Sequence, residues 1–253
     1  MLSVENINAE LNTKFLARKI IYLPETSSTN TEAWKYIEDK TMNGSLIITD
    51  YQTSGKGRRK NAWSSFPGKS LTFSIILFAK DYSSKLSIFP LLTGISIVNG
   101  ILSSIYIQTG LKWPNDIMLS RKKMGGILIE SKLLDNNPVT VIGIGLNINE
   151  QIVNFPNSIK NHATSLSIYS KKQFNRERIL AEILNEFEVM LYKDTDEIIT
   201  LWEKNCIHNN SCVSFHSENK KYNGIFQGIG EDGYARIKIN ENIKKFSSGL
   251  ITL

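Results

Sequence analysis

The feature that most constrains the fold is a nearly all-apolar run from 139 to 147, which also contains two glycines. A strand that is apolar on both sides is typically buried on both faces, near the centre of a sheet. Glycines inside such a strand usually mark a place where a ligand or another element approaches the backbone closely. We therefore expect a sheet with this strand near its middle, and a close neighbour at Gly143 and Gly145.

The periodicity of the remaining side chains predicts further elements around that strand. β-Branched or alternating runs predict strands at 19–23, 45–51, 70–79 and 126–133. Helical spacing predicts helices at 31–40, 86–107, 176–192 and 198–204, the second of them buried and broken near Pro90. Any of four polar residues can cap the first helix, namely Ser27, Ser28, Thr29 and Asn30. This succession predicts an α+β fold.

After residue 205 the chain changes to short strand-like runs separated by turn signals. The predicted strands are 212–215, 222–227, 234–239 and 244–246, and the predicted turns include Asn223-Gly224, Asp232-Gly233 and Asn240-Glu241. Short strands at this close spacing are typical of a small β-barrel. A chain of 253 residues with 41% hydrophobic content can bury one sizeable core beside such a module. We expect a main domain over 1–206 and an all-β module over 207–253.

The N-terminal segment and the long apolar segment bear on where the protein resides. Residues 1–15 carry acids early and lack a continuous apolar core, so they resemble neither a secretory signal nor a transit peptide. The apolar segment 86–107 is interrupted by proline, glycines and serines, whereas a membrane span needs roughly 20 mostly apolar residues in succession. We expect a buried helix there and a protein of the cytoplasm.

The cysteines and histidines do not form a recognisable reactive or metal-binding pattern. Cys206 and Cys212 have neither redox nor zinc-knuckle spacing. His162, His208 and His216 lack the i, i+4 spacing of a metal pair on a helix, and they support no Ser-His-Asp arrangement. We expect no structural metal, and chemistry that relies on other groups.

A basic loop from 55 to 63 is the first segment that indicates chemistry. Its first six residues hold two glycines and four cations, so its amides and side chains can surround a phosphate. The loop matches neither a Walker loop nor a dinucleotide fingerprint. A solvated basic turn and a nucleic-acid contact are its alternatives, and the formal net charge of +6 is compatible with each anionic partner.

Three later segments add polar groups at fixed positions. In Lys-Trp-Pro-Asn-Asp at 112–116, the proline fixes the chain beside two polar side chains, although such a pair also occurs in structural turns. Lys-Met-Gly-Gly at 123–126 leads into an apolar strand, and Gly-Ile-Gly-Leu-Asn follows at 143–147. Taken singly, none of these segments specifies a function.

In this order, the segments resemble the motif series of the biotin protein ligases. The series consists of Ser28-Thr29-Asn30, Gln52 before the glycine and arginine loop, Lys-Trp-Pro-Asn-Asp, Lys-x-Gly-Gly-Ile-Leu-x-Glu at 123–130, and Gly-x-Gly-x-Asn. The resemblance runs from about residue 21 to the C-terminus. It implies a mixed-sheet catalytic domain of the biotin/lipoate ligase type followed by an SH3-like β-barrel. It also implies a ligase that uses ATP and Mg²⁺ to form biotinyl-5'-AMP, and passes biotin to a lysine of a biotin carboxyl carrier protein or carboxylase subunit.

The resemblance also implies roles for individual residues. The implied catalytic residues are Lys123, Lys112, Asp116 and Arg58. The implied biotin-binding residues are Ser28, Thr29, Asn30, Gln52, Gly55, Lys56, Gly57, Arg58, Lys123, Gly126 and Gly145. The implied ATP-binding residues are Arg59, Trp63, Lys112, Asn115 and Asn147. We expect Asp116 near the acceptor amine, either as a base or as an orienting group.

Departures from the family pattern lead to further expectations. The commonest loop of the family, Gly-Arg-Gly-Arg-Arg-Gly-Arg, has Lys56, Lys60 and Asn61 here in place of Arg, Gly and Arg. Lysine keeps the charge but lacks the bidentate fork of arginine, so we expect a weaker hold on the adenylate. Only about twenty residues precede the first core strand, too few for a helix-turn-helix domain, so we expect no specific DNA binding. The resemblance allows a homodimer.

Two rival functions differ from this expectation. A lipoate or octanoate transferase of the same superfamily would need a cysteine nucleophile, and neither cysteine lies in a site motif. A nucleic-acid-binding module would use the basic segments 56–60 and 121–123 together with the C-terminal lysines, and its binding would weaken steeply with salt and be indifferent to biotin.

Overall fold

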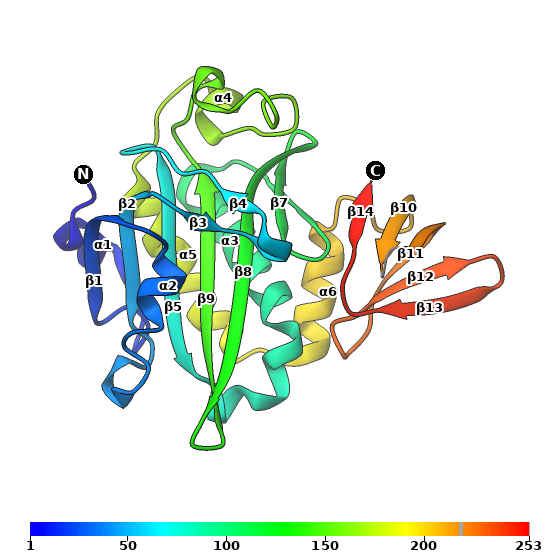
Figure 1. Cartoon of the computed structure of the whole chain (residues 1–253), viewed down its shortest axis with the longest axis horizontal. Helices are drawn as coiled ribbons and strands as arrows, with labels where there is room; N and C mark the ends of the chain where they lie inside the picture. The colour runs from blue at the N-terminus through cyan, green and yellow to red at the C-terminus, as the bar shows by residue number, and fades with distance from the viewer. Residues whose placement is uncertain (218–219, 253) are drawn as a thin grey trace.

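A seven-stranded mixed sheet forms the centre of the fold in the computed structural model, which describes residues 1–217 and 220–252 (Figure 1). Its strands, in spatial order, are β1 (Ile20–Thr26), β2 (Leu46–Gln52), β5 (Ser70–Phe78), β9 (Asn137–Asn147), β8 (Lys122–Leu134), β7 (Asp116–Leu119) and β6 (Gly110–Lys112). The β1–β2 pair is parallel and the other pairs are antiparallel. The apolar run at 139–147 therefore lies in the middle strand, as predicted.

The side chains of β9 alternate between two different environments. Ile142 and Ile144 belong to the main hydrophobic core, whereas Val141 belongs to a smaller cluster on the opposite face of the sheet. Because side chains alternate along a strand, Gly143 and Gly145 continue the face of Val141. Because these two glycines have no side chains, they leave room on that face of the sheet.

Helices cover the main-core face of the sheet, behind it in Figure 1. They are α3 (Phe89–Ile105), α5 (Arg176–Leu191) and α6 (Thr195–Asn205). Gly100 of α3 lets α5 approach closely, because a Cβ there would lie 2.6 Å from the Cα of Ile183. The predicted segment is interrupted near Pro90, as expected: a 3-10 helix ends at Ile88 and α3 begins at Phe89, with Pro90 in its first turn, where the missing N–H is tolerated.

The long apolar segment Tyr82–Ile105 is buried in the fold. Its length and composition would suit a membrane-crossing helix, but 72% of its most apolar 18-residue stretch is buried inside the protein. Its α-helical part, α3, packs against α5 and against the strands β6, β7 and β8. The prediction of a buried helix is confirmed.

The opposite face of the sheet carries short elements in place of long helices. These are α2 (Thr29–Ala33) and a small hairpin of β3 (Gly55–Lys56) and β4 (Ala62–Trp63), which crosses in front of the sheet in Figure 1. The helix predicted at 31–40 is wrong in extent, because α2 begins two residues earlier and ends at Ala33. Ser28 is its N-cap residue, although its side chain makes no capping hydrogen bond.

A second, five-stranded antiparallel sheet follows α6. Its order is β13 (Asn242–Phe246), β12 (Ala235–Ile239), β11 (Lys220–Ile229), β10 (Cys212–Ser217) and β14 (Leu250–Thr252). The turns predicted at 232–233 and 240–241 are confirmed by positive φ angles at Gly233 and Asn240. The predicted Asn223-Gly224 turn is wrong, since both residues lie inside β11, where a Cβ on Gly224 would meet the carbonyl oxygen of Lys238 at 2.4 Å. The domain boundary at 206–207 stays a prediction.

The remaining elements were not predicted as separate elements, although the end of η3 and the start of η1 overlap predicted helices. They are α1 (Val4–Glu10), α4 (Leu166–Ser170), and the 3-10 helices η1 (Lys40–Met42), η2 (Arg58–Lys60), η3 (Ala79–Ile88) and η4 (Ile152–Asn154). Of these, η2 forms the tip of the β3–β4 hairpin and bears on the site described below.

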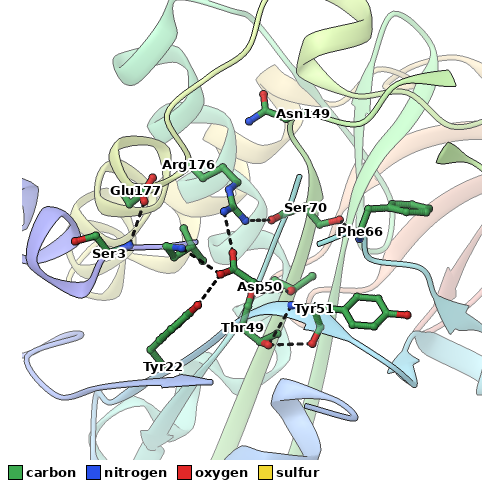
Figure 2. A network of polar contacts seen from close by, with 12 residues as sticks. Ser3, Tyr22, Thr49, Asp50, Tyr51, Phe66, Ser70, Asn149, Arg176 and Glu177 are labelled. Carbon is green, nitrogen blue, oxygen red and sulfur yellow. Dashed lines mark hydrogen bonds and ion pairs between the residues drawn. The ribbon is translucent and has the colours of Figure 1, made fainter. Parts of the chain in front are cut away.

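A buried ion pair joins the N-terminal segment, β2 and α5 (Figure 2). The Asp50 carboxylate accepts hydrogen bonds from the Arg176 guanidinium at 2.8 Å, the Tyr22 hydroxyl at 2.6 Å and the backbone amide of Leu2 at 3.2 Å. Arg176 also donates to the carbonyl oxygen of Ser70 at 2.9 Å. Both charged side chains are more than nine-tenths buried, and their hydrogen bonds link elements far apart in sequence.

Candidate functional site

A cavity lies on the face of the sheet that carries α2 and the β3–β4 hairpin, and it holds most of the predicted site residues. Those that line it are Ser28, Thr29, Asn30, Gln52, Lys56, Gly57, Arg58, Arg59, Trp63, Lys112, Asn115, Asp116, Lys123, Gly126 and Gly145. They come from α2 and the residue before it, the end of β2, the hairpin, the four strands β6, β7, β8 and β9, and the segment between β6 and β7. The structure thus brings five separate sequence motifs to one place.

Two predicted site residues do not line this cavity. Gly55 pairs with Trp63 in the hairpin, where a Cβ would lie 2.4 Å from the Trp63 carbonyl oxygen. The buried Asn147 side chain donates to the carbonyl oxygen of Thr164 at 3.0 Å and so fastens the end of β9 to a neighbouring loop. Their assigned contacts with biotin and ATP stay predictions.

One end of the cavity is neutral and polar. The Gln52 side-chain oxygen accepts from the backbone amide of Thr29 at 2.7 Å and from its hydroxyl at 3.1 Å. Ser74 on β5 contributes a hydroxyl that lies 2.7 Å from both the Thr29 hydroxyl and the Asn30 side-chain oxygen. These four residues are all buried, so their hydrogen bonds hold each side chain in one orientation.

The hydrogen bonds of this network determine which groups remain for a ligand. Both bonds to Gln52 end on its oxygen, so its amide nitrogen keeps two donors. The Asn30 oxygen accepts one bond from Ser74 and keeps a second lone pair. A ligand that offers both an acceptor and N–H donors on a small neutral ring suits this end of the cavity.

Cationic side chains gather at the other end of the cavity. The Lys123 ammonium lies 2.5 Å from the Asp116 carboxylate, and Lys112 lies on the neighbouring strand β6. Burial lowers the pKa of Lys112, with Asp116 opposing this shift and Lys123 adding to it. The Lys123 chain passes over Gly126, where a Cβ would approach its Nζ to 3.5 Å. The cations outnumber the single carboxylate here, so this end suits an anionic group.

The hairpin brings Arg58 over the same end of the cavity. Arg58 donates to the Asn115 side-chain oxygen at 3.0 Å, and the Asn115 nitrogen donates to the carbonyl oxygen of Ile127 at 2.8 Å. Burial lowers the pKa of Arg58, and the charge of Arg59 adds to this effect. Asn115 thus links the hairpin to β8. The sequence predicted a basic loop here, and the structure has a hairpin in which the Gly57 amide donates to the carbonyl oxygen of Asn61 at 2.8 Å.

Trp63 has a donor that no described group satisfies. Its indole nitrogen is buried without a hydrogen-bond partner among the described residues. The ring lies on Gly145, where a Cβ would fall 2.5 Å from the nearest ring carbon. A buried donor beside a cavity is costly unless a bound group or water satisfies it, so Trp63 is oriented for a ligand acceptor.

Several lining residues were not predicted as site residues. They are Asn61, Ala62, Trp113, Pro114, Ile127, Leu128, Gly143, Ile144, Gly249 and Leu250. Gly143 could have been found, because it lies in the same Gly-x-Gly-x-Asn segment as Gly145. Leu250 begins β14 of the C-terminal sheet and Gly249 directly precedes it, and no local pattern links them to this cavity. Ser74 was missed for the same reason, since its partners lie more than forty residues away.

Replacing Gly143 by alanine should weaken the binding of a ligand at the polar end. The new Cβ would lie 2.0 Å from the Asn30 side-chain oxygen, and Asn30 cannot withdraw easily because its amide is hydrogen-bonded at both ends. A misplaced polar group in such a site costs about 10- to 100-fold in affinity. Calorimetric titration with biotin, the ligand that the motif resemblance implies, tests this. Equal affinities of Gly143→Ala and wild type would contradict the expectation.

Comparison with known proteins agrees with this geometry. A sequence model described as the biotin/lipoate A/B protein ligase family matches residues 22–149. The bifunctional ligase/repressor BirA of Bacillus subtilis strain 168 is 33% identical over 258 aligned residues, which cover 100% of this chain and 79% of the relative. The chain belongs to the biotin/lipoate A/B protein ligase family.

Other relatives and solved structures extend the comparison. The biotin--[acetyl-CoA-carboxylase] ligase of Mycobacterium tuberculosis is 27% identical over 179 residues, covering 69% of this chain and 64% of that protein. The biotin protein ligase from Aquifex aeolicus, solved in complex with biotin and ATP, has a TM-score of 0.79 and 30% identity, covering 93% of this chain and 98% of that one. The predicted fold class, an α+β fold with a mixed-sheet domain of the biotin/lipoate ligase type, is confirmed, and the module predicted as an SH3-like β-barrel is a five-stranded antiparallel sheet.

Proposed function

We propose that this chain is a biotin protein ligase, which forms biotinyl-5'-AMP from biotin and ATP and then transfers biotin to a lysine of a biotin carboxyl carrier protein. The observation that carries the proposal is the single cavity with a neutral polar end and a cationic end. Biotin has a cyclic urea at one end and a carboxylate at the other, and these two groups match the two ends. The Aquifex relative has biotin and ATP bound in its structure.

The first step joins two anions. A biotin carboxylate oxygen attacks the α-phosphorus of ATP, the new C–O–P linkage forms, and pyrophosphate leaves with the electrons of the broken P–O bond. No nucleophile of the protein is needed, so catalysis consists of positioning and charge neutralisation. We assign this neutralisation to Lys112 on β6, Lys123 on β8 and Arg58 at the tip of the hairpin. The contacts of Arg59, Trp63 and Asn115 with the nucleotide belong to the same proposal.

Magnesium fits this site as a companion of the nucleotide. Among the described residues, no group of three or more His, Cys, Asp or Glu side chains could hold a metal. Mg²⁺ is usually held by substrate phosphates, water and one or two carboxylates, so the scarcity of protein ligands is compatible with it. Asp116 is the carboxylate of the described cavity wall that could contribute. The ion would supply further charge neutralisation at the phosphates.

The second step consumes the adenylate. The uncharged amine of the carrier lysine attacks the acyl carbonyl carbon, an amide bond forms, and AMP leaves with the electrons of the C–O bond. The attacking amine must first lose a proton, and Asp116 is assigned to receive or orient it. The hairpin would shield the adenylate from water until the carrier arrives.

Lys56→Arg should slow the release of the adenylate. Lys56 is exposed on the hairpin, and arginine would add a bidentate fork at the same charge. One added charged hydrogen bond is worth about a tenfold change in release rate. Filter-binding or stopped-flow release of labelled biotinyl-5'-AMP measures it, with Lys40→Arg outside the cavity as the control. Equal release from wild type and Lys56→Arg would reject the idea.

The proposal is tested by incubating the chain with labelled biotin, Mg-ATP and a carrier domain. Transfer of label to the carrier supports it, and transfer of lipoate in place of biotin would favour the related ligase activity. Steeply salt-dependent nucleic-acid binding without biotin transfer would favour the binding module. A location in the cytoplasm, a homodimer and the lack of specific DNA binding stay predictions.

A further inference from the structure

Glu130 lies on β8 next to the polar end of the cavity, two residues after the lining residue Leu128. One of its carboxylate oxygens accepts from the Asn30 side-chain nitrogen at 2.8 Å and from the Trp34 indole nitrogen at 3.4 Å. The strand alternation puts Gly126, Leu128 and Glu130 on one face of β8. Glu130 does not line the cavity itself, so any effect on a ligand passes through Asn30.

The orientation of the Asn30 amide follows from these partners. A carboxylate and a backbone carbonyl only accept hydrogen bonds, and the Asn30 nitrogen is near both Glu130 and the carbonyl oxygen of Leu128, the latter at 3.4 Å. The Asn30 oxygen must therefore point the other way, toward Ser74 and Gly143. The two ends of an amide are nearly equal in size, and without such partners a half-turn would exchange donor and acceptor.

We propose that Glu130 is a positioning residue that fixes Asn30 as a hydrogen-bond acceptor and thereby selects ligands whose ring carries N–H groups. The proposal rests on the proposed function, because the ring in question is the cyclic urea of biotin. An Asn30 oxygen with a free lone pair accepts a ring N–H, whereas a rotated Asn30 would present its own N–H to that group. A site built for a hydrogen-bonding ring rejects an analogue that leaves its buried groups unpaired.

Trp34 holds the Glu130 carboxylate in place, and Lys132 packs on the Trp34 ring. Trp34 lies just after α2 and donates to the same carboxylate oxygen that Asn30 uses, so two donors converge on one atom. The ammonium of Lys132, two residues beyond Glu130 on β8, lies 4.4 Å from the centre of the Trp34 ring. A glutamine at position 130 can present its carbonyl oxygen to the same two donors, whereas an alanine cannot.

The first experiment measures ligand selectivity. Dissociation constants are determined by calorimetry for biotin and for its two cyclic carbamate analogues, in each of which an oxygen replaces one ring N–H. In wild type, we expect the analogue that lacks the N–H facing Asn30 to bind about 100-fold more weakly than biotin. Glu130→Ala should weaken biotin binding about 10- to 100-fold and reduce that preference to less than about tenfold, since a freed Asn30 can donate to the ring oxygen.

Three controls separate positioning from a loss of structure. Glu130→Gln should keep the preference within about fivefold of wild type, because the donor–acceptor pattern is preserved. The Glu32 carboxylate on α2 bonds only to Lys35 and Tyr36 among the contacts described. Glu32→Ala should therefore leave the affinities for biotin and for the carbamate analogues unchanged. The apparent KM for ATP and the melting temperature should stay near the wild-type values in every one of these variants.

A second experiment uses a compensating pair. Asn30→Asp faces the Glu130 carboxylate with a second carboxylate and should lose biotin affinity. The double variant Asn30→Asp/Glu130→Gln restores a donor between the two positions, and we expect it to recover at least about tenfold of the lost affinity. This test remains informative if Glu130→Ala fails to fold.

Three results would overturn the proposal. They are an affinity of Glu130→Ala for biotin within twofold of wild type, an affinity loss that leaves the preference for the urea ring unchanged, and no recovery in the double variant. A wild-type chain that does not bind biotin would instead refute the proposed function on which this inference rests.

Discussion

Lys123→Ala should lower the rate of biotinyl-5'-AMP formation about 10³-fold, because it removes a fixed positive charge at the place where two anions must meet. The Lys123 ammonium lies at the cationic end of the cavity, bonded to Asp116 at 2.5 Å, while its side chain is still 43% exposed. Its loss also leaves Asp116 without its ion-pair partner, which adds a repulsive charge near the reacting carboxylate.

Biotin-dependent exchange of labelled pyrophosphate into ATP measures this step without a carrier protein. Lys122→Ala is the matched control, since Lys122 is the neighbouring exposed lysine at the start of the same strand, β8. Lys123→Arg keeps the charge with a different shape, and we expect intermediate activity. An exchange rate of Lys123→Ala within tenfold of wild type would show that another group neutralises the anions.

Asp50→Ala should destabilise the fold by about 3–5 kcal/mol, because it leaves the buried Arg176 guanidinium without its counter-charge. The Arg176 side chain is 6% exposed and that of Asp50 is 9% exposed, so water cannot replace the missing carboxylate (Figure 2). The same change removes the acceptor of the Leu2 amide and of the Tyr22 hydroxyl. Urea unfolding at neutral pH measures the loss, with the exposed Glu38→Ala as control, and a loss below about 1 kcal/mol would contradict this account.

The same ion pair predicts a dependence of stability on pH. Burial by itself would raise the pKa of Asp50, but hydrogen bonds from Tyr22, Arg176 and Leu2 lower it overall below the usual value. A carboxyl whose pKa is lower in the folded state adds stability above its unfolded pKa, about 3.9, and this contribution is lost as the pH falls further. The difference in unfolding free energy between wild type and Asp50→Ala should therefore shrink below about pH 4.

Much of the fold and of the cavity wall follows from local sequence. The apolar run at 139–147 identifies the central strand, because burial on both faces leaves no polar side. Its glycines identify the face that carries the cavity, as Asn30 and Trp63 occupy the space of the missing side chains. The polar and cationic motifs were predicted to form one site, and nearly all of them line one cavity.

The remaining features depend on contacts between distant segments. Nothing near Ser74 or Glu130 in the sequence indicates that both would hold the Asn30 amide. The Asn223-Gly224 pair has the composition of a turn, but Gly224 is needed for the close approach of β12. The early start of α2 also depends on distant segments, because its first residue, Thr29, is hydrogen-bonded to Gln52 on β2 and Ser74 on β5.

The central claim is that one cavity holds a cyclic urea at its polar end while cations at its other end bring a carboxylate and a phosphate together. The most direct measurement is a crystal structure of the chain with biotin and a non-hydrolysable ATP analogue. We predict the urea ring against Asn30 and Gln52, and the carboxylate and α-phosphate beside Lys123 and Arg58. Density that places either ligand away from Lys123 and from residues 55–59 would contradict the claim.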